Sequence, residues 1–282
     1  MSSIDICVLA DPYLRDCDIR ALVHAIDELD VTISLVIVNE PIQQNIDQEA
    51  AADAVNENIG LQTVKLFWDV LKKERFWTFV IAEQKLLDQF STADTLEEQT
   101  PVEEVSCFQD AEIKRVQPIR DGNWNELPPE IVSQVEDRCD VAVRYGFGLL
   151  RGDILSAPEW GVLSFHPADI RRYRGLGPPQ AYLDGRETIG VTLQRLTDEV
   201  DAGEIIAFDE AEIAKTDTLW DIYPRVHDVQ VELLAKGLSQ LSDPDFEPTV
   251  PDEMGPYYST KRRRKFSFSV RILLKNFRRR LR

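Results

Sequence analysis

The chain has few of the residues from which metal centres and disulfide frameworks are built. Among its 282 residues are only four cysteines and three histidines. The cysteines are widely separated and include no CxxC pair; they are Cys7, Cys17, Cys107 and Cys139. Zinc sites and disulfide-rich domains use closely spaced cysteines. We therefore predict small, largely buried cysteines and no bound metal.

Long apolar runs and common nucleotide-binding or hydrolase motifs are also missing. The sequence has no run of 18 apolar residues, and its first residues do not form a secretory signal. No GxGxxG follows the first predicted strand, and there is no Walker loop, GxSxG or HExxH. We expect a cytoplasmic protein without a dinucleotide fingerprint.

Lysine is scarce, and charge is divided unevenly along the chain. Ten lysines stand against 22 arginines. Residues 1–260 carry a net charge of −29, whereas residues 261–282 carry +11 and no acidic residue. An acidic, lysine-poor body is typical of a salt-adapted protein, because salt screens the repulsion between carboxylates. An acidic protein from an ordinary environment is the alternative. In both cases we predict that the body does not bind nucleic acid, since phosphates need basic surface.

What the sequence does contain is an alternation of apolar strands and helices. Apolar, β-branched segments at 4–10 and 31–38 flank a helical pattern at 18–29. Further strands are predicted at 112–119, 189–197 and 203–213, a strand followed by a loop at both 139–150 and 161–167, and further helices at 128–138 and 218–241. Continuous apolar strands joined by helices predict a Rossmann-like α/β fold, an open and mostly parallel sheet with helices on both faces.

We predict one α/β domain over residues 1–250, followed by a linker and basic tail at 251–282. An apolar-rich pattern at about 61–90 predicts an inserted helix pair or bent helix. Residues 41–60 are predicted to form a loop or weak helix, and residues 91–111 an exposed acidic connection. His24 and His227 fall within helical patterns, and we predict structural roles for both.

Two loops follow predicted strands in the middle of the chain. The first has the sequence Tyr-Gly-Phe-Gly at 145–148, and the second follows Ser-Phe-His at 164–166. In open α/β sheets, ligands bind outside the carboxyl ends of the strands. We therefore expect the two loops to share one crevice.

Residues 139–213 taken together resemble the 10-formyltetrahydrofolate-dependent formyltransferase family. The matching segments are CDVAVRYGFGLL and GVLSFHPADIRRYRGLGPPQAYLDGRETIGVTLQRLTDEVDAGEII. They contain a YG loop, a strand that ends in histidine, a Tyr-Arg-Gly turn, a Gly-Val-Thr strand and an Asp-x-Gly. The combination is most similar to the methionyl-tRNA and amino-sugar branches. We expect the barrel domain of the tRNA branch to be absent.

The resemblance implies formyl transfer from 10-formyltetrahydrofolate to an amine, without a metal, at a group of asparagine, histidine and aspartate. His166 matches the histidine, Asp201 matches the aspartate, and Ser164 occupies the asparagine position. The resemblance further implies folate contacts at Tyr145, Gly146, Phe147, Gly148, Leu149, Leu150, Asp198 and Gly203. It implies acceptor contacts at Arg172, Arg174, Gly175 and Pro178.

The chemistry of formyl transfer explains why these residue types are needed. The reaction passes through a tetrahedral oxyanion, which a fixed hydrogen-bond donor stabilises. Imidazole can take a proton from the attacking ammonium, and a carboxylate that faces the ring stabilises its charged form. Serine is shorter than asparagine, so Ser164 would act by a closer approach or through a bridging water. Otherwise the oxyanion relies on His166 alone, or the site only binds.

Several arginines lie near the predicted crevice. Arg144 is predicted to crowd the pterin side of the crevice or to pair with Asp198 and Glu199, with a surface ion pair as the alternative. The run Arg171, Arg172 and Arg174 predicts a phosphate-binding edge for the substrate, because planar guanidinium groups suit phosphates. A solvated loop is the alternative.

The last 22 residues, KRRRKFSFSVRILLKNFRRRLR, form a basic amphipathic pattern. One helical stripe contains Phe266, Val270, Leu273, Leu274, Phe277 and Leu281. This pattern predicts a helix on an anionic membrane surface, with a disordered RNA-binding tail and a helix folded back on the acidic body as alternatives.

These observations favour a formyltransferase that acts on an amino sugar or sugar nucleotide, cytoplasmic and peripheral on the inner membrane face. A tRNA or purine-precursor acceptor, or a binding protein without activity, are the alternatives. The sequence makes no prediction about oligomeric state.

Overall fold

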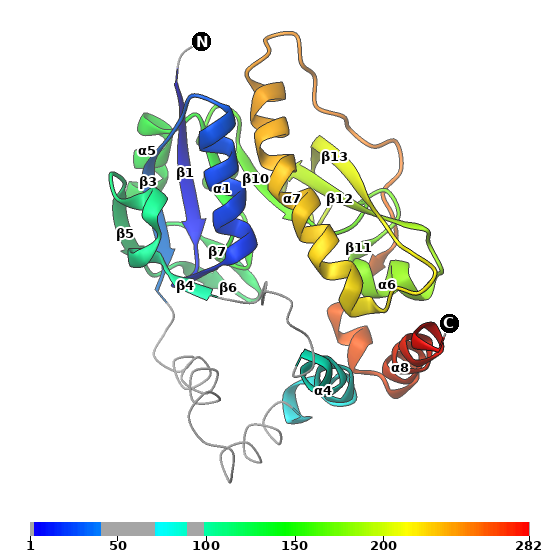
Figure 1. Cartoon of the computed structure of the whole chain (residues 1–282). Coiled ribbons are helices and arrows are strands. Elements are labelled where there is room, and N and C mark those ends of the chain that lie inside the picture. Colours follow the sequence, from blue (N-terminus) through cyan, green and yellow to red (C-terminus); the bar gives the residue numbers. More distant parts are fainter. Residues whose placement is uncertain (1–2, 41–70, 89–98, 282) are drawn as a thin grey trace.

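The structure is a computed structural model that describes residues 3–40, 71–88 and 99–281 (Figure 1). The loop or weak helix predicted at 41–60 lies outside the described residues, and so does part of the insertion predicted at 61–90. Within that insertion, residues 71–74 and helix α4 (Trp77–Asp88) are helical.

A seven-stranded sheet forms the centre of the molecule, in the order β13-β12-β10-β8-β1-β3-β5. The bounds are β1 (Ile4–Ala10), β3 (Val31–Asn39), β5 (Glu112–Val116), β8 (Val141–Arg144), β10 (Val162–His166), β12 (Thr188–Arg195) and β13 (Glu204–Glu212). The strands from β10 to β5 are parallel, whereas β12 and β13 join antiparallel. The prediction of an open, mostly parallel α/β sheet is confirmed.

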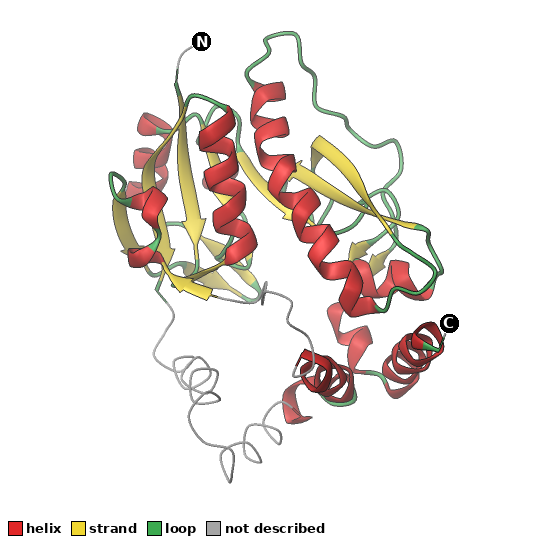
Figure 2. Cartoon of the chain, viewed as in Figure 1, coloured by secondary structure: helices red, strands yellow, loops and turns green. Residues whose placement is uncertain are grey.

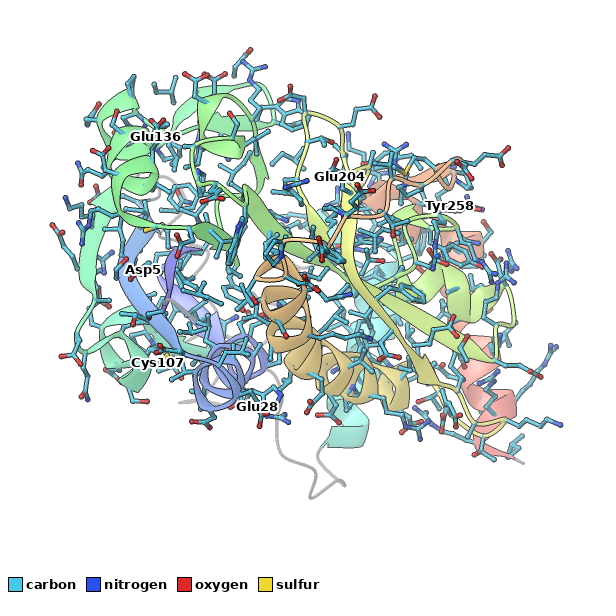
Figure 3. All side chains as sticks on the ribbon, turned by 90° about the horizontal axis from the view of Figure 1, so that it is seen from above. Asp5, Glu28, Cys107, Glu136, Glu204 and Tyr258 are labelled. Carbon is cyan, nitrogen blue, oxygen red and sulfur yellow. The ribbon has the colours of Figure 1, made fainter. Side chains whose placement is uncertain are left out.

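Helices cover both faces of this sheet (Figure 2). Helices α1 (Asp16–Glu28) and α7 (Leu219–Leu241) pack against each other over one face, around the larger apolar core. Helix α5 (Pro129–Arg138) packs on a second core that contains Ile131 and Val135. Glu28 on α1 and Glu136 on α5 are exposed, and Figure 3 shows them on different sides of the body.

Three small sheets surround the central one. Strand β2 (Tyr13–Arg15) pairs with β4 (Gln99–Pro101), and β7 (Trp124–Glu126) lies between β6 (Ile119–Asp121) and β9 (Leu149–Leu150). Strand β11 (Arg174–Gly175) pairs with β14 (Tyr257–Tyr258). The prediction of a single strand over 112–119 is therefore wrong after Val116, where β5 ends, and Ile119 begins the separate strand β6. Pro118 separates β5 from β6, because proline cannot donate to the ladder.

The described part of the connection predicted at 91–111 is not simply exposed. Residues 99–111 contain β4 and two short 3₁₀ turns at Val102–Glu104 and Ser106–Phe108. Val102, Val105 and Phe108 are buried in the larger core. The acidic composition of this segment led to the prediction that it is exposed. Its three buried apolar residues are three positions apart, and a 3₁₀ turn places residues of that spacing on one side.

The C-terminal segment packs against the body. Helix α8 (Phe266–Arg280) lies beside α4 and also contacts α6 (Pro178–Leu183). Its buried face carries Phe268, Ser269, Ile272 and Asn276. The tail is a helix, so the prediction of a disordered tail is wrong, whereas the prediction of a helix folded back on the body holds for this face.

The remaining predicted structural residues lie largely as expected. Cys7, Cys17 and Cys139 are buried and Cys107 is half-buried. The half-buried His24 has Nε2 3.0 Å from Oε2 of Glu232. Within the described ranges, no group of three or more metal-ligating side chains is present. None of the helices described is both long and apolar enough to cross a membrane.

Candidate active site

Two of the predicted catalytic residues, Ser164 and His166, lie on β10 beside the parallel strand β8, and the third, Asp201, lies in the turn between β12 and β13. Arg144 is the last residue of β8, and His166 is the last residue of β10. Ser164 lies opposite Arg144 in the strand register. Ser164 and His166 are two residues apart, so they point to the same face of the sheet. The two loops that follow these strands therefore leave the sheet at the same edge, and the crevice that they were predicted to share stays a prediction.

His166 is only 4% exposed, and both of its ring nitrogens face acceptors. Nε2 lies 2.8 Å from the carbonyl oxygen of Tyr173, and Nδ1 lies 3.4 Å from Oδ1 of Asp201. The carbonyl and the carboxylate can only accept hydrogen bonds, so a neutral ring, with one N–H, satisfies one of them. The imidazolium form has two N–H groups and satisfies both, so the site favours a protonated ring beside the carboxylate.

Asp201 has a left-handed backbone conformation, and a backbone donor holds its side chain. Its φ of 47° lies in the left-handed region, which is costly for a residue other than glycine. Its Oδ2 accepts a hydrogen bond of 2.8 Å from the N–H of Gly175. Burial raises the pKa of Asp201. The hydrogen bond and charge of His166, the Gly175 N–H and the charge of Arg144 outweigh burial and lower that pKa below its usual value of 3.8. The side chain is therefore a carboxylate.

Arg144 reaches across the strands to Ser164. Its Nε and Nη2 donate to the Ser164 hydroxyl oxygen over 3.2 and 2.7 Å, and its Nη1 donates to the carbonyl oxygen of Gly148. The predicted pairing of Arg144 with the 198–199 loop is thus wrong. Glu199 instead lies 3.7 Å from Nη2 of Arg174. Burial lowers the pKa of Arg144, and the charges of Asp201 and Asp11 act in the opposite direction.

The loop at 145–150 is shaped by Asp11, which directly follows β1 and was missed in the sequence. A side chain at Gly146 would collide with the backbone nitrogen of Asp11. Oδ1 of Asp11 accepts a 3.0 Å hydrogen bond from the N–H of Phe147, whose φ is 64°. The position of Asp11, at the carboxyl end of the first parallel strand, was the available signal.

The six predicted folate contacts in this loop divide into buried and accessible residues. Gly146, Phe147 and Leu150 are buried, and Phe147 belongs to the core on the α5 side. Gly148 is exposed, and Tyr145 and Leu149 are half-buried. Gly148 and Leu149 are therefore the residues best placed to contact a folate, and the buried residues fix the loop conformation.

The other two predicted folate residues flank Asp201. Asp198 is exposed in the turn that precedes it. Gly203 is buried, donates its N–H to Oε1 of Gln194 over 3.1 Å, and leaves no room for a side chain against the carbonyl oxygen of Arg195. Gly203 thus closes the turn that carries Asp201.

The predicted acceptor residues are held mainly by acceptors of the chain itself. Arg174 donates through Nε and Nη2 to the carbonyl oxygen of Val200, over 3.0 and 2.7 Å. Arg171 and Arg172 both face Asp169, at 2.7 and 3.6 Å. The phosphate-binding role of these arginines stays a prediction.

The remaining acceptor residues have clear positions. Gly175, with a φ of 77°, supplies the N–H that holds Asp201. Pro178 is buried at the start of α6. Of the two, Gly175 is directly linked to the predicted catalytic pair.

Comparison with known proteins identifies relatives in one family. The Formyl transferase family matches residues 88–238, which is more than half of the chain. A methionyl-tRNA formyltransferase from Natranaerobius thermophilus is 32% identical over 138 residues, which cover 49% of this chain and 44% of that protein. The chain spans less than half the length of the curated relatives that it matches.

Solved structures share the fold at low sequence identity. The N-formyltransferase from Helicobacter canadensis, determined with folinic acid and dTDP-3-aminofucose, has a TM-score of 0.54 and 13% identity, over 97% of this chain and 80% of that chain. A formyltetrahydrofolate deformylase from Pseudomonas syringae pv. tomato has a TM-score of 0.52 and 20% identity, over 89% and 67%. On the match over residues 88–238, this chain belongs to the formyl transferase family.

Proposed function

We propose that the protein transfers a formyl group from 10-formyltetrahydrofolate to the primary amine of an amino-sugar nucleotide. The observation that carries this proposal is the buried pair of His166 and Asp201 at the carboxyl edge of a formyl transferase sheet, beside Ser164. The acceptor class is supported by the Helicobacter canadensis neighbour, which was determined with a folate and a dTDP-amino sugar.

In this proposal the His166 and Asp201 pair handles the proton of the reaction. The amine nitrogen attacks the formyl carbon and forms the new C–N bond, and collapse of the tetrahedral centre breaks the bond to N10 of the folate. The amine nitrogen loses a proton when it adds to the formyl carbon, and we assign this proton to the His166 and Asp201 pair, in which Nδ1 faces the carboxylate and Nε2 faces the Tyr173 carbonyl. Asp201 stabilises the imidazolium, and the proton finally reaches N10 of the departing tetrahydrofolate.

Arg144 explains how serine can act at the asparagine position. A hydroxyl group has one proton to donate and two lone pairs that accept. Arg144 donates twice to the Ser164 oxygen, so the hydroxyl proton is left to donate to a third group. We assign this proton to the oxyanion, and we assign to Arg144 the positioning of Ser164 and the favourable charge nearby.

Two other readings make different predictions. The curated relatives act, by their names, on methionyl-tRNA, and a tRNA acceptor would need basic surface. The net charge of −29 on residues 1–260 opposes that acceptor. A chain without activity would bind folate and release no tetrahydrofolate.

The experiment is a tetrahydrofolate-release assay with 10-formyltetrahydrofolate and a panel of amines. The panel holds dTDP- and UDP-linked amino sugars, methionyl-tRNA and glycinamide ribonucleotide. We expect turnover with amino-sugar nucleotides, and a loss of about 10²–10⁴-fold in kcat for His166→Asn. His24→Asn is the matched control, because His24 lies on α1 away from the site. Turnover with methionyl-tRNA alone would replace the acceptor, and a folded protein without turnover on any amine would refute the proposal.

We further propose that the protein is cytoplasmic and associates peripherally with the inner membrane face through residues 261–282. Part of the stripe predicted from the sequence is exposed: Phe266, Leu274, Phe277 and Leu281 are 49–72% accessible. Phe76, in the turn before α4, is 41% exposed and extends this apolar surface, since its ring lies 5.1 Å from that of Phe266. Phe79 of α4 is also exposed, at 49%. Exposed apolar groups of this kind suit insertion into a lipid interface.

The charge around this apolar surface is complementary to anionic lipid. Arg271 and Arg278 are exposed on α8, about two helical turns apart. Residues 261–282 contain no acidic residue. Each basic residue near an anionic membrane contributes about 1 kcal/mol. We therefore name an anionic lipid surface, rather than a protein, as the partner of the exposed face of α8.

A further inference from the structure

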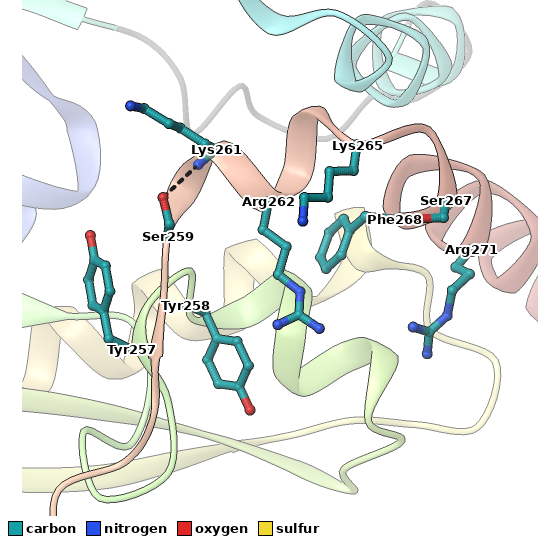
Figure 4. Close-up of a pocket in the computed structure, with 9 residues that line it drawn as sticks. All are labelled: Tyr257, Tyr258, Ser259, Lys261, Arg262, Lys265, Ser267, Phe268 and Arg271. Atoms are coloured by element: carbon teal, nitrogen blue, oxygen red, sulfur yellow. Dashed lines mark hydrogen bonds between the residues drawn. The ribbon is translucent and has the colours of Figure 1, made fainter.

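A cavity of about 500 Å³ lies between strand β14 and the first turn of α8 (Figure 4). Four basic residues line it together with aromatic and serine residues, and its lining contains no acidic residue among those that the structure describes. The basic residues are Lys261, Arg262, Lys265 and Arg271, and Tyr257 and Tyr258 form one wall. In Figure 4 the side chains of Arg262, Lys265 and Arg271 extend to one side, whereas that of Lys261 extends away from them. A volume of this size is typical of small-molecule sites.

The four cations are unmatched, although the body around them is strongly acidic. Among the residues that the structure describes, none of the four forms an ion pair with a carboxylate. Their sequence neighbours Arg263 and Arg264 do form ion pairs, both with Glu74, at 3.0 and 3.3 Å. Arginines with a structural role in this segment thus have their acid, whereas the cations around the cavity lack one.

The other groups in the lining favour a phosphate. The Arg262 guanidinium lies over the Tyr258 ring, 5.0 Å from its centroid, which orders the side chain at the cavity wall. Ser267 and Phe268 belong to the first turn of the 15-residue helix α8, so the positive end of the helix dipole lies at the same wall, although the Phe268 N–H donates to the Lys265 carbonyl at 3.1 Å. The hydroxyls of Ser259 and Ser267 add neutral polar groups.

The cavity is connected to the proposed active site through one pair of strands. Tyr258 of β14 lies opposite Gly175 of β11, and the Gly175 N–H holds Asp201. Tyr173, which directly precedes β11, contacts Nε2 of His166 through its carbonyl oxygen. A ligand that occupies the cavity would therefore lie one strand away from the segment that supports both predicted catalytic side chains.

We propose that this cavity binds the diphosphate group of the amine acceptor. The assignment rests on the proposed formyl transfer for the identity of the ligand, but the phosphate site itself stands on the cavity and its unmatched cations. Its lining, residues 257–271, lies beyond residues 88–238, where the chain matches its family. The chain thus adds to the family's sheet a phosphate site from its own C-terminal segment.

The first experiment measures binding of pyrophosphate and of uridine diphosphate to the full chain by calorimetry, without folate or amine. We expect binding to the wild type and at least a tenfold weaker affinity in the Lys265→Ala, Arg271→Ala double variant, since each removes charge-assisted hydrogen bonds. Arg278→Ala is the matched control, because it removes an exposed arginine of the same helix that does not line the cavity. Equal affinity in the double variant, or no binding to the wild type, would overturn the proposal.

A second arm separates the acceptor from a lipid phosphate. The chain is sedimented with vesicles of phosphatidylglycerol in phosphatidylcholine, with and without soluble pyrophosphate. If the double variant loses only vesicle binding and pyrophosphate does not compete, the assignment to the acceptor is overturned in favour of a lipid headgroup. If turnover is found, the double variant is expected to raise the acceptor KM at least tenfold with kcat little changed. Because pyrophosphate binding is measured without turnover, absence of formyl transfer leaves that result interpretable by itself.

Discussion

At the scale of single residues, two side chains on adjacent strands stand where one amide was expected. Ser164 is 1% exposed and accepts both hydrogen bonds from Arg144, whose third donor holds the carbonyl of Gly148. Arg144 therefore links the predicted oxyanion donor to the loop that begins after β8. The serine at the expected asparagine position and the arginine at 144 therefore act together, because Arg144 donates both hydrogen bonds that Ser164 accepts.

The first prediction is a coupling between these two residues. Ser164→Ala is expected to lower kcat by about 10²–10³-fold, the usual cost of losing one oxyanion donor. Arg144→Met should cost less, because the hydroxyl remains but is no longer oriented. Steady-state kinetics of both single variants and the double variant give the coupling energy. Ser156→Ala, which removes an exposed serine hydroxyl, is the control.

The coupled pair also has a decisive counter-test. Ser164→Asn alone should not raise activity. The Arg144 guanidinium lies 2.7 Å from the serine Oγ, so the longer asparagine side chain would collide with it. An asparagine variant more active than the wild type would instead mean that the native site is degenerate.

The second prediction concerns the acid stability that Asp201 contributes. Its pKa is lowered in the folded protein, so between that value and the usual 3.8 the unfolded chain binds more protons. The free energy of unfolding should therefore fall as the pH drops through this range, and Asp201 contributes its full stabilisation above it. Denaturant titrations between pH 6 and 3 should give a shallower pH dependence for Asp201→Asn than for the wild type. An unchanged slope would contradict the role assigned to the carboxylate.

At the scale of elements, helix α8 has two faces with different tasks. Its buried face packs Phe268 and Ile272 into the core, and Asn276 joins three other elements. Oδ1 of Asn276 accepts from the Tyr182 hydroxyl at 2.9 Å and from the Leu219 N–H at 3.0 Å, and its Nδ2 donates to Glu83 at 2.8 Å. The opposite face remains apolar and exposed.

The third prediction follows from the buried face. Asn276→Ala leaves the Leu219 N–H and the Tyr182 hydroxyl without this acceptor, which should cost about 1–3 kcal/mol of unfolding free energy. Leu281→Ala changes an exposed residue of the same segment and should alter stability by no more than about 0.5 kcal/mol. Equal unfolding midpoints in urea for the two variants would show that α8 is not docked in this way.

The fourth prediction follows from the exposed face. Phe277→Ser combined with Leu281→Ser should reduce binding to anionic vesicles at least tenfold, because two apolar side chains no longer enter the lipid. Vesicle sedimentation with phosphatidylglycerol in phosphatidylcholine measures this. Ile119→Ser is the control, since Ile119 is 54% exposed on β6. Binding equal to that of the wild type would remove α8 as the membrane-facing element.

At the scale of the whole molecule, charge is separated between the body and the C-terminal segment. The segment is held by specific pairs, such as those of Arg263 and Arg264 with Glu74 and of Arg280 with Glu83, and by buried apolar residues. The body keeps a large excess of carboxylates, many of them exposed (Figure 3). Docking of α8 therefore does not depend on the net attraction alone.

The fifth prediction is that salt stabilises the protein, as expected for a salt-adapted chain. Raising KCl from about 0.1 to 1 M shortens the Debye length from about 10 to 3 Å and screens the repulsion within the body. The Tm should rise over this range, since the buried contacts of α8 are screened little. Calorimetry in KCl measures the change. A Tm that falls steadily with salt would indicate that ion pairs dominate and that the acidic composition is not an adaptation.

Most of the fold could be predicted because strand and helix patterns are local. The apolar run at 4–10 becomes β1 with the same bounds, and the pattern at 218–241 becomes α7. The segment at 99–111 could not be predicted, since its three buried apolar residues, Val102, Val105 and Phe108, are interspersed with Glu103, Glu104 and Asp110 and follow neither a strand nor an α-helix period. The segments 145–150 and 164–166 could be placed at the same edge of the sheet because ligand-binding loops follow the carboxyl ends of parallel strands.

By itself the sequence determined the sheet, the family resemblance and the positions of His166, Asp201 and Ser164, because these depend on patterns along the chain. Only the tertiary structure decided which groups face them. It assigned Arg144 to Ser164 rather than to the 198–199 loop and placed Nε2 of His166 beside a backbone carbonyl. It also brought to one cavity four basic residues that pair with no carboxylate in the described part of the chain. The physical reason is that hydrogen bonds and charge pairing act over a few ångströms in space, between residues that sequence spacing does not relate.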